Sequence, residues 1–156
     1  MRLELTRRGD YAIRAMLLLA QDPHDVFTGA EIARRTGIPV RVVTQVMGQL
    51  VRASLAQARI GRRGGYWLGD DGPTIAILDI VEAVEGDARR ERCVLSGALC
   101  DAANRCQVHD IFASAQEALI TRLAETSLGS ALSGRLSSSL RGVSPGTRLP
   151  APVAAG

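Results

Sequence analysis

Residues 28–53 carry two amphipathic helix patterns separated by a tight turn, and this arrangement constrains the fold more than any other feature of the sequence. Thr28 and Glu31 have the spacing of a capping box, and Gly37 is suited to end the helix that they begin. Pro39 suits the first turn of the next helix, which runs to about residue 53. Its apolar residues recur at core spacing: Val43, Val46, Met47 and Leu50. We expect a helix-turn-helix unit.

The outer face of the second helix carries side chains that form hydrogen bonds. This face consists of Arg41, Thr44, Gln45, Gly48 and Arg52. A helix of this kind, joined tightly to its neighbour, fits the major groove of double-stranded DNA. The residues predicted to read or approach the bases are Arg41, Thr44, Gln45 and Gln49. Thr28 is placed on the same DNA-binding surface. The alternative to a DNA-binding unit is an ordinary pair of solvated helices.

The next segment has the pattern of a β-hairpin. Short strands are expected at residues 55–60 and 66–68, and the glycines between them suit a tight loop. All 19 basic residues of the chain are arginines, whose planar guanidinium groups match phosphate oxygens. We predict a wing that holds the DNA backbone or enters the minor groove through Arg59, Arg62, Arg63 and Gly64. The alternative is a solvated charged turn.

Further helices are expected on both sides of this unit. One begins near Thr6 and ends by Asp22, and another ends at Gly86. Their apolar residues recur at helical spacing: Ala12, Ala15, Met16 and Leu19 in the first, and Ile77, Val81 and Val84 in the second. The predicted fold class is mainly α with a small β wing, formed by a winged helix-turn-helix domain at residues 1–86 plus a long dimerisation helix.

The long helix is expected to start near Cys106, within a dimerisation segment at residues 107–132. Its apolar stripe consists of Val108, Ile111, Phe112, Ala115, Leu119 and Leu123. A stripe of this length is too long to bury against one short neighbour, so a second copy of the chain is its natural cover and we predict a homodimer. Thr126 is expected to cap a short final helix. Residues 133–156 are rich in Ser, Gly, Pro and Ala, which predicts a disordered tail.

All three cysteines fall in a loop expected at residues 87–106. Cys93, Cys100 and Cys106 are separated by six and five residues, and His109 follows closely. A secreted disulfide scaffold normally has an even number of cysteines spread along the chain, so such a framework is disfavoured. The spacings are wider than those of zinc knuckles, and three thiolates on a flexible loop can wrap an iron-sulfur cluster. Zinc, redox-active thiols and buried packing are the alternatives.

Several short segments occur in an order and at a spacing that together are specific. They are residues 1–3 (MRL), 9–12 (GDYA), 63–66 (RGGY), 68–69 (LG), 80–86 (IVEAVEG) and 126–128 (TSL), with the three cysteines. In these segments the chain resembles the IscR/NsrR/RirA family of winged-helix regulators over residues 1–132. The resemblance implies homodimers that bind operator DNA and carry a 4Fe-4S or 2Fe-2S cluster near the dimer interface. It also implies that Cys93, Cys100 and Cys106 are three of the cluster ligands.

The resemblance offers two candidates for the fourth ligand. His109 matches the histidine that IscR-type members use for a 2Fe-2S cluster, and Asp10 matches the position from which NsrR-type members supply a carboxylate to a 4Fe-4S cluster of the other subunit. IscR lacks an acidic residue at the start of the first helix, which favours Asp10. Structural alternatives exist for both residues. Asp10 has the spacing to pair with Arg14, and His109 is placed to cap its helix or to be solvated beside Asp110.

Together with these features, the resemblance implies a homodimeric transcription regulator whose operator affinity is set by an iron-sulfur cluster that senses iron or cluster status, redox state or nitric oxide. Near the start of the chain there is neither a bilayer-length apolar run nor a signal-peptide core, so we expect a cytoplasmic protein without a membrane segment. An enzyme is not expected, because no nucleophile–base pair or phosphate loop is recognised. The alternatives are a clusterless regulator that responds to thiol oxidation or a partner protein, and an iron-sulfur electron-transfer protein.

Overall fold

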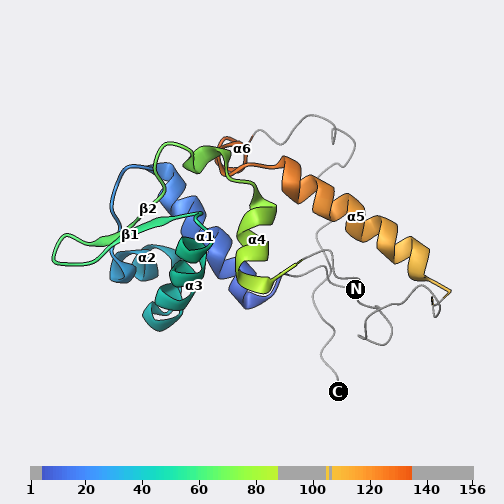
Figure 1. Ribbon diagram of the computed structural model, residues 1–156, viewed down its shortest axis with the longest axis horizontal. Helices are drawn as coiled ribbons and strands as arrows, with labels where there is room; N and C mark the ends of the chain where they lie inside the picture. The colour runs from blue at the N-terminus through green and yellow to red at the C-terminus, as the bar shows by residue number, and fades with distance from the viewer. Residues whose placement is uncertain (1–4, 88–104, 106, 135–156) are drawn as a thin grey trace, which may run out of the picture.

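The computed structural model describes residues 5–87, 105 and 107–134, which are mostly helical and include one small antiparallel sheet (Figure 1). In chain order the elements are α1 (Arg7–Gln21), α2 (Gly29–Thr36), α3 (Val40–Arg52), β1 (Gln57–Arg59), β2 (Gly65–Trp67), the 3-10 helix η1 (Gly72–Thr74), α4 (Ile77–Glu85), α5 (His109–Glu125) and α6 (Leu128–Leu132). The predicted fold class, mainly α with a small β wing and a long additional helix, is confirmed.

Polar caps fix where the first two helices begin. The Thr6 hydroxyl oxygen accepts a hydrogen bond from the Gly9 N–H at 3.3 Å, and the Thr28 hydroxyl oxygen accepts one from the Glu31 N–H at 3.2 Å. Helix α2 ends at Gly37, whose φ of 73° lies in the left-handed region that glycine adopts without strain. The predicted caps and the tight turn between α2 and α3 are therefore confirmed.

A single hydrophobic core joins α1, α2, α3, α4 and α6. Its largest fully buried side chains are Met16, Leu19, Ile32, Val43, Val46, Met47, Leu50, Ile80 and Leu128. The residues that helical spacing assigned to the core of α1, α3 and α4 are all buried. Because one face of each helix is buried here, the core also determines which side chains point outward.

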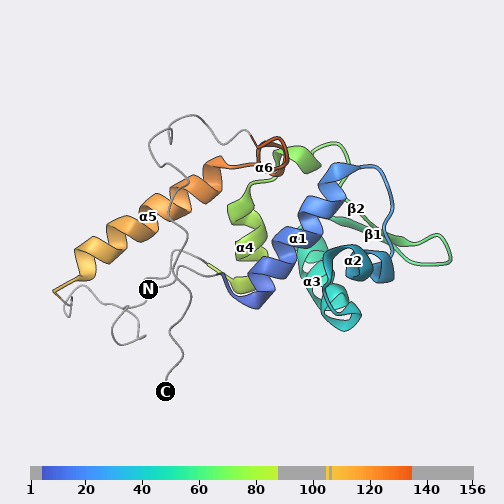
Figure 2. The same cartoon turned by 180° about the vertical axis from the view of Figure 1, so that it is seen from behind.

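Helix α6 packs into this core after α5, an arrangement that the sequence pattern does not predict. The Ile77 N–H donates to the Thr126 carbonyl at 2.8 Å, and the Leu128 N–H donates to the Ile75 carbonyl at 2.9 Å. The Leu128 side chain is fully buried. The chain therefore returns to the start of α4 after α5, so the C-terminal end of α5 is tied to the core (Figures 1 and 2).

The strands of the wing are shorter than the predicted ranges 55–60 and 66–68. Strand β1 pairs with β2 from Gln57 opposite Trp67 to Arg59 opposite Gly65. Ile60 follows β1 and is fully exposed. A three-residue ladder is sufficient to hold the wing because β2 also pairs with another segment of the chain.

The segment before α2 pairs with β2 and was not predicted to do so. Phe27 and Tyr66 exchange both backbone hydrogen bonds, at 2.9 and 2.8 Å. Gly65 permits this approach, because its φ is 154° and an added Cβ would lie 2.8 Å from the Phe27 carbonyl carbon. The wing is thus anchored directly to the start of the helix-turn-helix unit.

Helix α5 runs away from the core and uses only part of its surface to pack on it (Figures 1 and 2). Ile120 is 4% exposed, and Leu123 packs against the core cluster. Ile111 is 69% exposed and Leu119 is 41% exposed. The predicted continuous stripe is therefore divided, because Leu123 belongs to the packed face whereas Ile111 and Leu119 belong to a face that the described residues leave uncovered.

Two boundaries in the C-terminal part differ from the predictions. Helix α5 begins at His109 instead of near Cys106. Thr126 ends α5, and the cap of α6 is Ser127, whose hydroxyl oxygen accepts from the Ser130 N–H at 3.2 Å. Cys93, Cys100 and Cys106, most of the predicted loop and residues 135–156 of the predicted tail lie outside the described residues.

Candidate nucleic-acid interface

The outward face of α3 is fixed by the burial of its opposite face. Val43, Val46, Met47 and Leu50 are buried. Arg41, Thr44 and Gln45 are consequently exposed, and Gln49 is half-buried. The Thr44 hydroxyl donates to the Val40 carbonyl at 3.3 Å, which leaves its oxygen able to accept a further hydrogen bond. The structure thus brings the four predicted base-contacting residues onto one solvent-facing side of α3.

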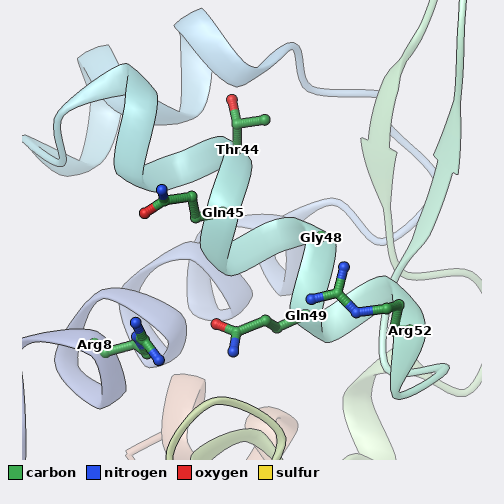
Figure 3. Close-up of a pocket in the computed structure, with 6 residues that line it drawn as sticks. All are labelled: Arg8, Thr44, Gln45, Gly48, Gln49 and Arg52. Atoms are coloured by element: carbon green, nitrogen blue, oxygen red, sulfur yellow. The ribbon is translucent and has the colours of Figure 1, made fainter.

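An open hollow of about 410 Å³ lies between α1 and this face of α3 (Figure 3). It is lined by Arg8, Thr44, Gln45, Gly48, Gln49 and Arg52. Arg8 was not assigned to the interface from the sequence, because it precedes α3 by some 30 residues and only the packing of α1 against α3 brings it there. Arg52 was placed on the outer face by helical spacing but was not assigned a DNA contact.

The strands of the wing lie on the same side of the molecule as α2 and α3, whereas α5 lies on the other side (Figures 1 and 2). Arg62 and Arg63 are exposed at the tip. The Arg59 guanidinium donates to the Arg63 carbonyl at 2.8 Å, so Arg59 also braces the loop. Gly64 is required by the loop itself, because a Cβ there would collide with the Arg59 carbonyl oxygen.

Thr28 is exposed at the start of α2, where its hydroxyl oxygen caps the helix. Its O–H group is a donor that the cap does not use. Helix N-termini also favour anions, because their first N–H groups point outward. The position is compatible with the predicted contact to DNA, although the cap alone accounts for a threonine here.

The two candidates for the fourth cluster ligand lie in different surroundings. The Asp10 carboxylate accepts from the Arg14 guanidinium at 2.8 Å, so the ion pair weighed as its structural alternative is present. His109 is the first residue of α5 and is 8% exposed, so the alternative of a solvated histidine is wrong. Within the described residues there is no group of three or more His, Cys, Asp or Glu side chains that could hold a metal ion. The three cysteines predicted as cluster ligands, Cys93, Cys100 and Cys106, lie outside the described residues.

An exposed recognition helix beside an arginine-tipped wing defines the winged helix-turn-helix class of transcription regulator. A family model described as Rrf2, iron-dependent transcriptional regulator, matches residues 5–133. The chain therefore belongs to the Rrf2 family of transcriptional regulators.

Similar proteins support this assignment. The regulator IscR of Klebsiella pneumoniae strain 342 is 31% identical over 131 residues, which cover 81% of this chain and 78% of that protein. IscR of Escherichia coli O1:K1 is 30% identical over 128 residues, with the same coverage. Both relatives are described as helix-turn-helix transcriptional regulators.

Solved structures share the fold. CymR of Bacillus subtilis, described as a global cysteine regulator, aligns with a TM-score of 0.72 at 21% identity, over 85% of this chain and 98% of that one. IscR of T. potens aligns with a TM-score of 0.66 at 23% identity, over 85% and 88%. The oxidized form of Staphylococcus aureus CymR aligns with a TM-score of 0.66 at 20% identity, over 83% and 96%.

None of the helices in the described part of the chain is both long enough and apolar enough to cross a membrane.

Proposed function

We propose that this protein binds operator DNA as a homodimer and that an iron-sulfur cluster controls its affinity. The observation that carries the DNA-binding part is the polar outer face of α3, which the buried residues on its other side hold toward solvent next to the wing. Arg41, Thr44, Gln45 and Gln49 approach the bases of the major groove. Thr28, Arg59, Arg62, Arg63 and Gly64 form contacts to the backbone or the minor groove.

The uncovered face of α5 supports the homodimer. Ile111 and Leu119 are large apolar side chains on one side of a helix that extends from the core, and Ala115 between them is also exposed. Apolar surface of this kind gains free energy when a partner removes it from water. A second copy that pairs α5 with α5 covers this face in both protomers and places two recognition helices on one DNA.

The side chains available as metal ligands support an iron-sulfur cluster held by Cys93, Cys100 and Cys106. Three thiolates with one carboxylate or imidazole are suitable ligands for iron, and the family is described as iron-dependent. When bound, such a cluster supplies a group whose charge and stability change with iron supply, oxidants or nitric oxide. Asp10 and His109 are the candidate fourth ligands, and Asp10 is favoured on the sequence argument. Its second carboxylate oxygen can bind a metal while the first holds Arg14.

The packing of α1 against α4 offers a route from the cysteine segment to the DNA-binding face. The Thr6 hydroxyl donates to the Glu85 carboxylate at 2.6 Å, which joins the start of α1 to the last residue of α4. The cysteine segment begins shortly after α4, and α1 carries both Asp10 and Arg8. A change in the cysteine segment therefore moves α1 relative to α3 and alters the spacing of the two recognition helices.

Anaerobic purification with iron and sulfide analysis, absorption spectra and operator-binding assays tests this proposal. We expect a coloured protein whose affinity for a selected operator changes when the cluster is removed by a chelator. A colourless, iron-free protein that binds the same DNA with the same affinity would contradict cluster control while leaving DNA binding intact.

Regulation by thiol oxidation is the second candidate. It is favoured by the ion pair that already occupies Asp10 and by the structural similarity to CymR, one structure of which is described as an oxidized form. In this case the iron-free protein responds to oxidants, and replacing the three cysteines by serine abolishes the response without changing DNA binding under reducing conditions.

A further inference from the structure

The hollow between α1 and α3 has a lining suited to an anion. Arg8 and Arg52 contribute two guanidinium groups, and Gln45 and Gln49 contribute two amides that can donate hydrogen bonds. Thr44 completes the lining, and none of the described residues that line the hollow carries a carboxylate. Figure 3 shows Arg8 on α1 across from Gln49 of α3, with Gly48 and Arg52 on the side of Gln49 away from Arg8. Guanidinium groups bind phosphate oxygens more strongly than neutral donors do.

Gly48 provides a second and independent observation, because no contact among the described residues requires a glycine there. It lies in the middle of α3, where glycine is unfavourable relative to alanine. An added Cβ would meet only the Arg52 guanidinium, at 3.6 Å, which is an ordinary contact. Gly48 is also not one of the glycines with positive φ. The missing side chain keeps the floor of the hollow open toward solvent.

We propose that this hollow binds a phosphate of the DNA strand bordering the major groove in which α3 lies. Arg8 and Arg52 supply the charge, and Gly48 lets the sugar-phosphate backbone approach the helix closely. The proposal rests on the DNA-binding function proposed above. Figure 3 shows α1 on one side of α3 and the strands of the wing on the other, so this contact and the wing arginines hold the recognition helix from both sides.

The salt dependence of binding to a duplex of mixed sequence tests the role of Arg8. Each phosphate contact contributes about 0.9 to the slope of log K against log salt concentration. We expect Arg8→Ala to lower the slope by about this amount per protomer and to weaken binding. Arg7→Ala is the matched control, because Arg7 lies in the same turn of α1, is exposed and does not line the hollow. Equal effects of the two substitutions, or an unchanged slope in Arg8→Ala, would overturn the proposal.

Gly48→Ala tests the close approach through two effects of opposite sign. Helix propensity predicts a higher melting temperature, whereas the added methyl group should weaken DNA binding by about three- to tenfold, a loss of roughly 0.7–1.4 kcal/mol. Weaker binding by a more stable protein cannot arise from damage to the fold. Unchanged affinity in Gly48→Ala would show that no backbone contact forms over the glycine and would overturn this part of the proposal.

The outcomes also separate this inference from the proposed function. If the wild-type protein binds the duplex and only the Arg8 and Gly48 effects are missing, the phosphate site is wrong and DNA binding stands. If the wild-type protein binds neither this duplex nor a selected operator, both proposals fail.

Discussion

Helices α3 and α5 are both amphipathic, but the fold holds them in opposite ways. Helix α3 has four buried side chains in 13 residues and a polar outer face. Helix α5 has two, His109 and Ile120, in 17 residues, and its exposed face carries Ile111 and Leu119. A helix of the first kind is oriented by its own chain, whereas one of the second kind leaves apolar surface in water until a partner covers it. The outer face of α3 is therefore suited to bind a ligand, whereas the face of α5 that carries Ile111 and Leu119 is suited to assembly. We call the latter the assembly face.

The largest effect on operator affinity is expected when the assembly face of α5 is disrupted. Leu119→Arg places a charge in the proposed α5–α5 seam, where desolvation is costly. The dimer should dissociate, and operator affinity should fall by about 100- to 10,000-fold because the two half-sites are no longer linked. Mass measurement and operator titration check both consequences.

Thr121→Arg is the matched control for this substitution. Thr121 is exposed on α5 but lies outside the face of Ile111 and Leu119, so the same added charge should leave the dimer intact. A wild-type chain that is monomeric at micromolar concentration would contradict the α5 interface, as would a dimer in Leu119→Arg.

The next largest effect concerns the buried face of α3. Met47 is fully buried, and Met47→Ala should lower the free energy of unfolding by about 2–5 kcal/mol through lost burial and the cavity left behind. Val40 lies on the same helix and is 53% exposed, so Val40→Ala should change stability by less than about 0.5 kcal/mol. Denaturant unfolding of both variants measures the difference. Similar losses in the two variants would show that the core does not orient α3.

The same contrast explains how much the sequence could predict. In α1, α3 and α4 the apolar residues follow the helical period because one face packs on the core, and pattern recognition therefore located their buried residues. Thr6 and Thr28 were found because a cap bonds to the backbone only three residues away. The outer residues of α3 could be predicted as well, since they occupy the positions left by the buried set.

Contacts between segments far apart in the chain were not predictable in this way. No local pattern shows that Phe27 pairs with Tyr66, or that Arg8 and Gln49 line the same hollow. Leu128 resembles any leucine of a short helix, and only the return of the chain to the start of α4 buries it. In α5 the whole apolar stripe was predicted to pack against a second copy of the chain. The sequence does not show that some of its residues, such as Leu123, already pack on the core.

A smaller effect is expected at the joint between α1 and α4. Thr6 caps α1 and donates to Glu85, so Thr6→Ala should lower the free energy of unfolding by about 1 kcal/mol. Under the proposed route it should also reduce the difference in operator affinity between the cluster-loaded and cluster-free protein. Thr6→Ser keeps the hydroxyl and should preserve both properties. An unchanged affinity difference in Thr6→Ala would show that this joint does not couple the cluster to DNA binding.

The smallest effect on stability is expected for substitution of Asp10. The same substitution is the most informative test of how the cluster is held. The Asp10–Arg14 ion pair lies at the surface and contributes only a few tenths of a kcal/mol, so Asp10→Ala and Arg14→Ala should unfold at nearly the same denaturant concentration. Arg14→Ala keeps the carboxylate that the proposed cluster needs. If Asp10 is the fourth ligand, only Asp10→Ala changes the absorption spectrum and the rate of cluster loss. If His109→Ala alone changes them, the histidine is the ligand. If none of the three variants differs from the wild type, neither Asp10 nor His109 binds the cluster.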